Sequence, residues 1–181
     1  LEGNYDGLVN QQLGQTAPGE NADFDYIDMV PNNFGRLALE RTHQFKLAGT
    51  YSFPFGLQAG LNSFLFSGRP ISLLGFARDT PIYSASRFLL PRGSYGELPW
   101  TYDIDLHLEY PVRFGGVTIA AIADVFNLTN VQQTTAVDER YNFLKKGNQS
   151  PPYTNPTNPT FGMATAWQTP RLVRVGARVS F

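Results

Sequence analysis

The side chains most able to do acid–base chemistry are the two histidines, His43 and His107. Asp105 precedes His107 by two residues, so on an extended strand the carboxylate would share its face and could orient the imidazole as a general base. No serine stands close to this pair in the pattern, and the chain has no cysteine nucleophile. We therefore predict that no residue is catalytic, that the protein is not an enzyme, and that His107 makes ordinary hydrogen bonds.

A group of acidic and amide side chains could bind a metal ion. It consists of Asn21, Asp23, Asp25 and Asp28. Their oxygens suit calcium, but the spacing lacks the glycine at position 6 and the glutamate at position 12 of an EF-hand loop. A solvated acidic loop explains the same residues. We predict no metal site and no cofactor, with calcium at residues 21–28 left open.

The composition excludes several classes of protein. Net charge is −1 over 181 residues, which gives no bulk field for nucleic acid. Charged residues make up 16%, below the usual quarter, and aromatic residues reach 14%. No run of 18 apolar residues predicts a transmembrane helix. The chain begins in mid-pattern at Leu1–Asn4, so we expect the true N-terminus to lie elsewhere.

Two long segments alternate apolar and polar residues with a period of two, which is typical of β-strands with one apolar face. Residues 171–181 place Val173, Val175 and Val179 on one parity. Residues 100–112 do the same over thirteen positions, with aromatic side chains at both ends of the apolar face. Strands of about 9–11 residues span a bilayer, and aromatic rings prefer its interfaces.

Weaker alternation predicts four more strands, at residues 1–8, 43–53, 57–67 and 117–125. In the third of the six, Phe64, Leu65 and Phe66 break the alternation, which indicates either a bulge or an inward-facing aromatic. His43 falls on the apolar parity of its strand. The connections between strands alternate in length. The long ones are residues 9–41, 68–98 and 127–170, and the short ones are 54–56 and 113–116.

Alternating long loops and short turns are typical of an outer-membrane barrel, with the loops extracellular and the turns periplasmic. The fold class is therefore all-β, an antiparallel transmembrane β-barrel in the outer membrane of a Gram-negative bacterium. Six strands are fewer than the eight of the smallest such barrels, and an open edge in lipid leaves backbone groups unpaired. We expect residues 1–181 to form the last six strands of a larger barrel. The Pro- and Asn-rich composition of residues 127–170 predicts a loop that buries no core.

Several segments resemble TonB-dependent outer-membrane receptors. Asp-Val-Phe-Asn-Leu-Thr-Asn at residues 124–130 is similar to their "DVFNL-N" signature. Gln-Thr-Pro-Arg at 168–171, Val-Gly-Ala-Arg at 175–178 and the terminal Phe181 look like their last strand. Residues 41–47 and 67–70 are similar to other strand starts and ends of the family. Residues 100–106 lean toward the Oar-like branch, which carries an N-terminal carboxypeptidase-regulatory-like domain.

The resemblance implies a 22-stranded barrel, a plug in its lumen, and import of a ligand energised through TonB. The plug and the TonB-contacting box have no counterpart in these residues, so the TonB complex would act through upstream residues. The implied partners are outer-membrane lipid, the remainder of the barrel and plug, and the barrel-assembly machinery, which would read the C-terminal aromatic strand. A passive porin or adhesin barrel and a soluble all-β binding module are the alternatives.

Two sets of residues are the candidate functional sites. Charges on the inward parity are expected to face the lumen or plug, or to form a hydrogen-bonded wall: Asp103, Asp105, Glu109, Asp124, Arg174 and Arg178. Loop side chains are expected to contact a peptide or carbohydrate ligand, or to pack on one another: Tyr83, Arg87, Tyr95, Tyr141, Tyr153 and Trp167. The cargo, the source organism and the oligomeric state do not follow from the sequence.

Overall fold

The computed structural model describes residues 2–3, 27, 30–76, 87–143 and 156–181. The chain divides into two compact units. The first, here called the sheet unit, comprises His43–Ser67, Trp100–Gln133 and Trp167–Phe181. The second, here called the loop unit, comprises Leu1–Thr42, Gly68–Pro99 and Thr134–Ala166. Among the described residues, no helix is both long and apolar enough to cross a bilayer.

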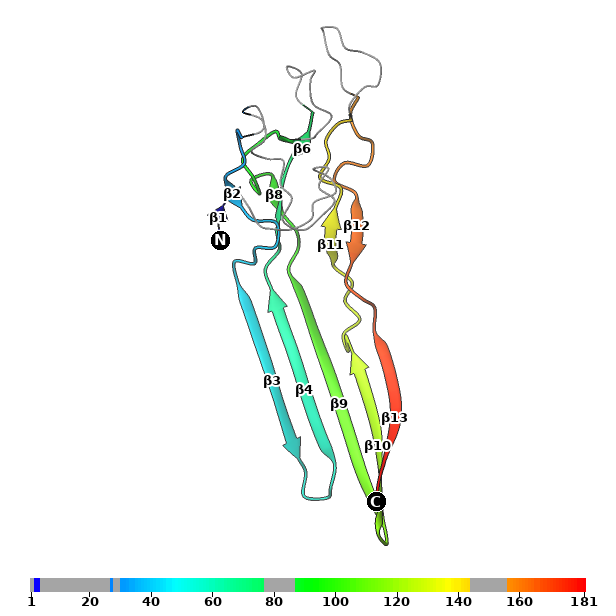
Figure 1. Ribbon diagram of the computed structural model, residues 1–181. Coiled ribbons are helices and arrows are strands. Elements are labelled where there is room, and N and C mark those ends of the chain that lie inside the picture. Colours follow the sequence, from blue (N-terminus) through cyan, green and yellow to red (C-terminus); the bar gives the residue numbers. More distant parts are fainter. Residues whose placement is uncertain (1, 4–26, 28–29, 77–86, 144–155) are drawn as a thin grey trace. The chain divides into compact units, whose positions relative to one another are not determined.

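The sheet unit is one antiparallel sheet in which each strand pairs with the next long strand of the chain (Figure 1). Its order is β13–β10–β9–β4–β3. The strands are β3 (Gln44–Ser52), β4 (Gln58–Phe66), β9 (Thr101–Phe114), β10 (Val117–Phe126) and β13 (Leu172–Ser180). All five lie within the predicted strands or extend them by one or two residues. Figure 1 shows both short turns and the C-terminus at the same end of this sheet.

The register carries the alternation of each strand across the whole sheet. Leu61 of β4 lies opposite Gly49 of β3 and Leu106 of β9, whereas the next residue, Asn62, lies opposite Ala48 and Asp105. Because directly paired residues point to the same side, one face collects the apolar side chains and the other the polar ones. We call these the apolar face and the polar face.

The irregular pattern of β4 contains inward-facing aromatics, and the alternative of a bulge is wrong. Pairing is continuous from Gln58 to Phe66 against both β3 and β9, so no extra residue interrupts either ladder. Phe64 and Phe66 therefore lie on the polar face, where their rings stack with centroids 4.7 Å apart. The Lys46 ammonium lies 5.5 Å from the Phe66 ring centroid, which gives this apolar pair a cation–π neighbour.

Both short turns depend on glycine. Between β3 and β4, Gly56 has a φ of 96° and donates its N–H to the Phe53 carbonyl at 2.9 Å. Between β9 and β10, strand pairing continues to Phe114, so the turn contains only Gly115 and Gly116 instead of the predicted residues 113–116. Gly115 has a φ of 60°, a conformation that glycine adopts without steric cost.

The described sheet contains five of the six predicted strands. Of the predicted strand at residues 1–8, the structure describes β1 (Glu2–Gly3), which pairs with β2 (Gly35–Arg36) in a separate two-stranded sheet. Within the described residues no further strand pairs with the outer edges of β3 and β13. The sheet is therefore open and not closed into a barrel.

The loop unit is held by short strand pairs and a very small core. β5 (Pro70–Ile71) pairs with β8 (Gly96–Glu97), β6 (Leu74–Gly75) with β7 (Arg87–Phe88), and β11 (Thr134–Val137) with β12 (Ala164–Trp167). Leu74 and Phe88 are buried together. Val137 is buried as well, so the prediction that residues 127–170 bury no core is wrong at this position.

Single side chains also fix the loop backbone. Asn142 accepts the Phe76 N–H at 2.7 Å and donates to the Phe76 carbonyl at 3.0 Å, like one extra residue of a β-ladder. Gly68 approaches another backbone segment so closely that a Cβ built on it would lie 1.6 Å from the Leu98 carbonyl oxygen. Only glycine fits at that position without moving the chain.

Candidate functional site

Two of the predicted polar-face charges, Asp124 and Arg174, form a hydrogen-bonded row with His107. The register places Asp124 of β10 directly between His107 of β9 and Arg174 of β13. Asp124 Oδ1 lies 2.6 Å from His107 Nδ1, and its Oδ2 accepts from Arg174 Nε at 2.9 Å and Nη2 at 2.8 Å. Asp124 therefore holds one cation and one imidazole at once.

A second ion pair joins this row. Arg178 of β13 reaches over β10 to Glu109 of β9, and the β10 residue opposite Arg178 is the small, buried Ala120. Glu109 Oε2 also lies 3.9 Å from His107 Nε2. The five side chains, here called the wall network, run in the order Arg178, Glu109, His107, Asp124 and Arg174.

Exposure within the wall network is uneven. The side chains of Glu109 and Asp124 are each 8% exposed, whereas those of Arg174 and Arg178 are 69% and 62% exposed. The carboxylates thus lie beneath the guanidinium groups, which is the arrangement that buried anions require. This geometry agrees with the hydrogen-bonded wall that the sequence offered as one alternative.

The sequence paired His107 with the wrong carboxylate. Asp105 accepts the Asn127 N–H at 3.1 Å through Oδ1 and the Asn62 amide at 3.4 Å through Oδ2. The carboxylate at His107 Nδ1 is that of Asp124, on the neighbouring strand. Residues two apart on one strand share a face, but directly opposite residues on paired strands lie closer, and the register decides between them.

Asp103 completes the set of six predicted polar-face charges. It lies on the same face of β9 as Asp105, outside the wall network. Its Oδ1 is buried and has no hydrogen-bond partner among the described residues. The six residues thus share one face but divide into four that belong to the ion-pair network and two, Asp103 and Asp105, that do not.

Asn127 fixes the end of β10, and the sequence gave no role to its side chain. It is 2% exposed and has a φ of 48°. Its Nδ2 donates at 2.8 Å to the carbonyls of both Val131 and Thr169. Asn130, three residues on, accepts the Arg171 N–H at 2.9 Å. The segment Asp124–Asn130 therefore combines one member of the wall network with two asparagines that tie β10 to the start of β13.

The loop candidates are partly brought together. The rings of Tyr95 and Tyr141 both pack on Phe161, with centroids 5.4 and 5.5 Å from it. They remain 48% and 41% exposed, so mutual packing and ligand contact are compatible here. Phe161 itself was not among the predicted residues, because a single phenylalanine in a polar loop carries no periodic pattern.

The other loop candidates are more scattered. Arg87 lies in β7 opposite Gly75, and Trp167 is the last residue of β12 and 57% exposed. Tyr83, Tyr153 and the candidate calcium ligands Asn21, Asp23, Asp25 and Asp28 lie outside the described residues.

A carboxylate-centred turn presents Phe161. Asp138 Oδ2 accepts from Asn158 Nδ2 at 2.8 Å and from the Thr160 hydroxyl at 2.7 Å. Partial burial would raise the pKa of Asp138, but these hydrogen bonds and the Arg140 N–H outweigh it and hold the pKa below its usual value. Asp138 is therefore an ionised structural residue at neutral pH.

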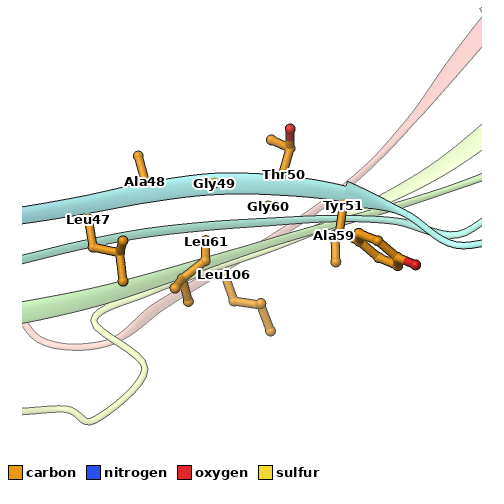
Figure 2. A pocket seen from close by; sticks show the side chains of 9 residues that line it. All are labelled: Leu47, Ala48, Gly49, Thr50, Tyr51, Ala59, Gly60, Leu61 and Leu106. Carbon is orange, nitrogen blue, oxygen red and sulfur yellow. The ribbon is translucent and has the colours of Figure 1, made fainter.

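The apolar face carries a shallow groove of 340 Å³. Figure 2 shows Leu47, Leu61 and Leu106 on the same side of the sheet, with Ala48 and Thr50 on the opposite side. The groove exists because Gly49 contributes no side chain, and a Cβ built on Gly49 would meet nothing within 4 Å. At the end of this face, His43 stacks on Trp100 with centroids 5.9 Å apart.

Comparison with known proteins gives one informative relationship. The chain is 29% identical over 212 aligned residues to the TonB-dependent transporter Oar of Myxococcus xanthus. The alignment covers all of this chain but about a fifth (20%) of the length of that transporter. No protein-family model matches the chain, and no solved structure matches it. The fold and the comparison together describe an all-β chain that is distantly similar to a TonB-dependent transporter.

Proposed function

We propose that this chain is the C-terminal barrel segment of an active outer-membrane transporter of the TonB-dependent family, in its Oar-like branch. The observation that carries the proposal is the similarity to a TonB-dependent transporter along the entire chain. In this proposal the strands belong to a 22-stranded barrel in the outer membrane of a Gram-negative bacterium. The segment is a wall of the transporter and neither an enzyme nor a cofactor-binding module.

The two-faced sheet supports the proposal. An apolar face that continues across five strands suits lipid, and the polar face suits a hydrated lumen or a plug. The outer edges of β3 and β13 carry backbone N–H and C=O groups with no partner strand among the described residues. In lipid each unsatisfied group costs several kcal/mol, so a transmembrane sheet of this kind requires further strands to close it.

The arrangement of the connections supports an orientation. The two glycine turns would be periplasmic, and the loop unit would be extracellular, where a ligand first meets the receptor. The exposed Tyr95 and Tyr141, with Arg87 and Trp167, are then candidates for ligand contact. TonB and the plug would be reached through upstream residues, and the barrel-assembly machinery would recognise β13.

The proposal is tested on the native polypeptide extracted from outer membranes in detergent. Its intact mass should exceed 20.1 kDa several-fold, because a closed barrel and plug need many more strands. In planar bilayers a plugged transporter should show no steady conductance, and it should bind the purified periplasmic domain of TonB. A steadily open channel without TonB binding would favour a passive porin instead. Recovery from the soluble fraction without detergent would exclude both.

A further inference from the structure

The two ends of the apolar face differ in the chemistry of their side chains. At the end with the two short turns and the C-terminus (Figure 1), the face finishes in exposed neutral aromatic rings, among them Tyr51, Tyr110 and Phe114. The opposite end carries His43 and, immediately before β13 and on its apolar parity, Arg171. Across the five described strands every aspartate and glutamate lies on the polar face. This charge distribution favours an anionic partner at the His43 end and not at the turn end.

His43 and Trp100 present nitrogen donors side by side at this end. Their rings stack with an interplanar angle of 11° and centroids 5.9 Å apart. The residue between them is the small Ser67 of the intervening chain, whose N–H donates to the His43 carbonyl at 2.9 Å and whose Oγ accepts the His43 N–H at 3.1 Å. Both rings are exposed, and neither the imidazole nor the indole N–H has a hydrogen-bond partner among the described residues. An imidazole keeps at least one N–H donor whether neutral or charged, so the pair can receive an acceptor group.

The groove of 340 Å³ lies farther along the same face. It is the gap that Gly49 leaves beside Leu47 and Leu61 (Figure 2). His43 and Gly49 are six positions apart in the chain, which is roughly 20 Å along an extended strand. With strands tilted by about 45°, this distance is about 14 Å of depth, close to one leaflet of a hydrocarbon core about 30 Å thick. The ring pair and the groove are therefore separated by about the length that one lipid molecule spans.

We propose that this face binds a phosphate-bearing lipid of the outer leaflet, with the phosphate at His43 and Trp100 and one acyl chain in the groove over Gly49. The inference rests on the proposed function, which places the apolar face in lipid and the His43 end toward the extracellular surface. Phosphate oxygens accept hydrogen bonds from both N–H donors, and the face presents no carboxylate that would repel them. An acyl chain fills an apolar groove without burying a polar group.

Native mass spectrometry of the full-length receptor in detergent tests the phosphate. The probes are dipalmitoyl phosphatidic acid and dipalmitoylglycerol, which share their chains and differ by the phosphate. The phosphatidic acid should bind about tenfold more tightly, which is the change that one hydrogen bond to a charged group supplies. His43→Phe and Trp100→Phe keep an aromatic ring but remove a donor, so each should reduce this preference. Tyr110→Phe removes a hydroxyl donor from the opposite end of the face and should leave the preference unchanged.

Gly49→Leu tests the groove in the same experiment. A Cβ at this position meets nothing within 4 Å, so the larger side chain fits and occupies the groove. The variant should bind dipalmitoyl phosphatidic acid severalfold more weakly. Dihexanoyl phosphatidic acid, whose chains end short of the groove, should bind as it does to the wild type. Ala121→Leu adds a leucine to the same face on β10, outside the groove, and should change neither affinity.

Several outcomes would overturn the lipid site. Equal affinity for the two dipalmitoyl lipids, or an equal loss of preference with Tyr110→Phe, would reject the phosphate contact. Equal binding by the two leucine variants would reject the groove. A dimer that binds neither lipid would mean that a second copy of the chain covers this face. Any of these results in a receptor that still binds TonB rejects the lipid site alone, whereas a preserved phosphate preference in an open channel without TonB binding keeps the site and removes the transporter.

Discussion

The sheet unit and the loop unit differ in how their backbone is hydrogen-bonded and held in place. In the sheet unit, long strands pair their backbone groups continuously, and many side chains each contribute a little by lying on the correct face. In the loop unit, six of the eight described strands contain only two residues. There, single residues such as Asn142, Asn158 and Gly68 fix the chain.

This difference determines how each unit responds to substitution. The sheet should tolerate most changes that preserve the character of a face and fail when a residue is placed on the wrong face. The loop unit should tolerate most changes of exposed side chains. It should be destabilised by substitution at the few positions where a close backbone approach or a single side-chain hydrogen bond fixes the conformation. The predictions below test that contrast.

The largest effect is expected from a charge placed on the apolar face. Val175 is 78% exposed on that face of β13, and in the proposed barrel Val175→Arg would put a guanidinium in lipid at a cost of roughly 2–4 kcal/mol near the midplane. Arg174→Val, one residue away, removes one of the two contacts of Asp124 but leaves the one with His107. The yield of folded, heat-modifiable barrel in outer membranes should therefore fall much further for Val175→Arg.

This comparison also tests which face meets lipid. Equal yields for the two variants would contradict the assignment of the faces, since each variant changes one charge on the same strand. A lower yield for Arg174→Val would reverse the assignment.

The second effect is confined to the loop unit. Gly68→Ala would place a methyl group 1.6 Å from the Leu98 carbonyl oxygen, so the backbone must move. Gly96→Ala is the matched control, because its nearest atom would be Ile71 Cδ1 at 4.0 Å. We expect Gly68→Ala to weaken the local structure by about 1–3 kcal/mol, as overpacked sites do. Faster hydrogen exchange of the Leu98 amide, which donates to the Arg69 carbonyl at 3.0 Å, would report this.

Two further measurements test whether the effect of Gly68→Ala is confined to the loop unit. Gly96→Ala should leave exchange at Leu98 unchanged, and neither variant should lower the yield of folded barrel. If Gly68→Ala instead abolished barrel assembly, the two units would not respond independently, and the contrast drawn here would be wrong.

The fold of the sheet unit could be predicted from the sequence because its information is periodic. Five long strands were located to within one or two residues, since each repeats the same alternation. The two-residue strands of the loop unit could not be found this way, because a pair such as Leu74–Gly75 is too short to show a period. Their positions depend on contacts between residues far apart in the chain.

For the candidate site, the sequence predicted which face of the sheet carries the charged residues, but it did not predict which of these residues pair with each other. Alternation predicted that Asp103, Asp105, Glu109, Asp124, Arg174 and Arg178 face the lumen, and the register places all six on the polar face of the sheet. Which charge meets which depends on the register, and the register is not contained in any one strand. The carboxylate beside His107 is therefore that of Asp124, whereas the sequence had suggested Asp105. Similarly, the packing of Tyr95 and Tyr141 on Phe161 joins segments that are remote in sequence.

The smallest effect is a pH dependence in the loop unit. Hydrogen bonds from Thr160 and Asn158 outweigh partial burial and hold the pKa of Asp138 below its unfolded value of about 3.9. The stabilisation by the ionised carboxylate is therefore complete above about pH 5 and is lost as the pH falls through the folded pKa. The Gly162 amide, which donates to the Asp138 carbonyl at 2.8 Å, should lose protection from hydrogen exchange on acidification.

The neighbouring Glu139 opposes this effect and must be separated from it. Burial raises the pKa of Glu139 although Arg69 counteracts it, so its ionised form destabilises the folded loop and protonation relieves that cost as the pH falls. Glu139→Gln removes the opposing titration, and in that background the loss of protection at Gly162 between about pH 5 and pH 2.5 should be larger than in the wild type. Adding Asp138→Asn should lower protection at pH 6 and abolish the remaining pH dependence, when each exchange rate is compared with that of an unstructured amide at the same pH. If the Asp138→Asn variant kept the wild-type slope, the carboxylate would not hold this turn, and the presentation of Phe161 would have to depend on Asn158 alone.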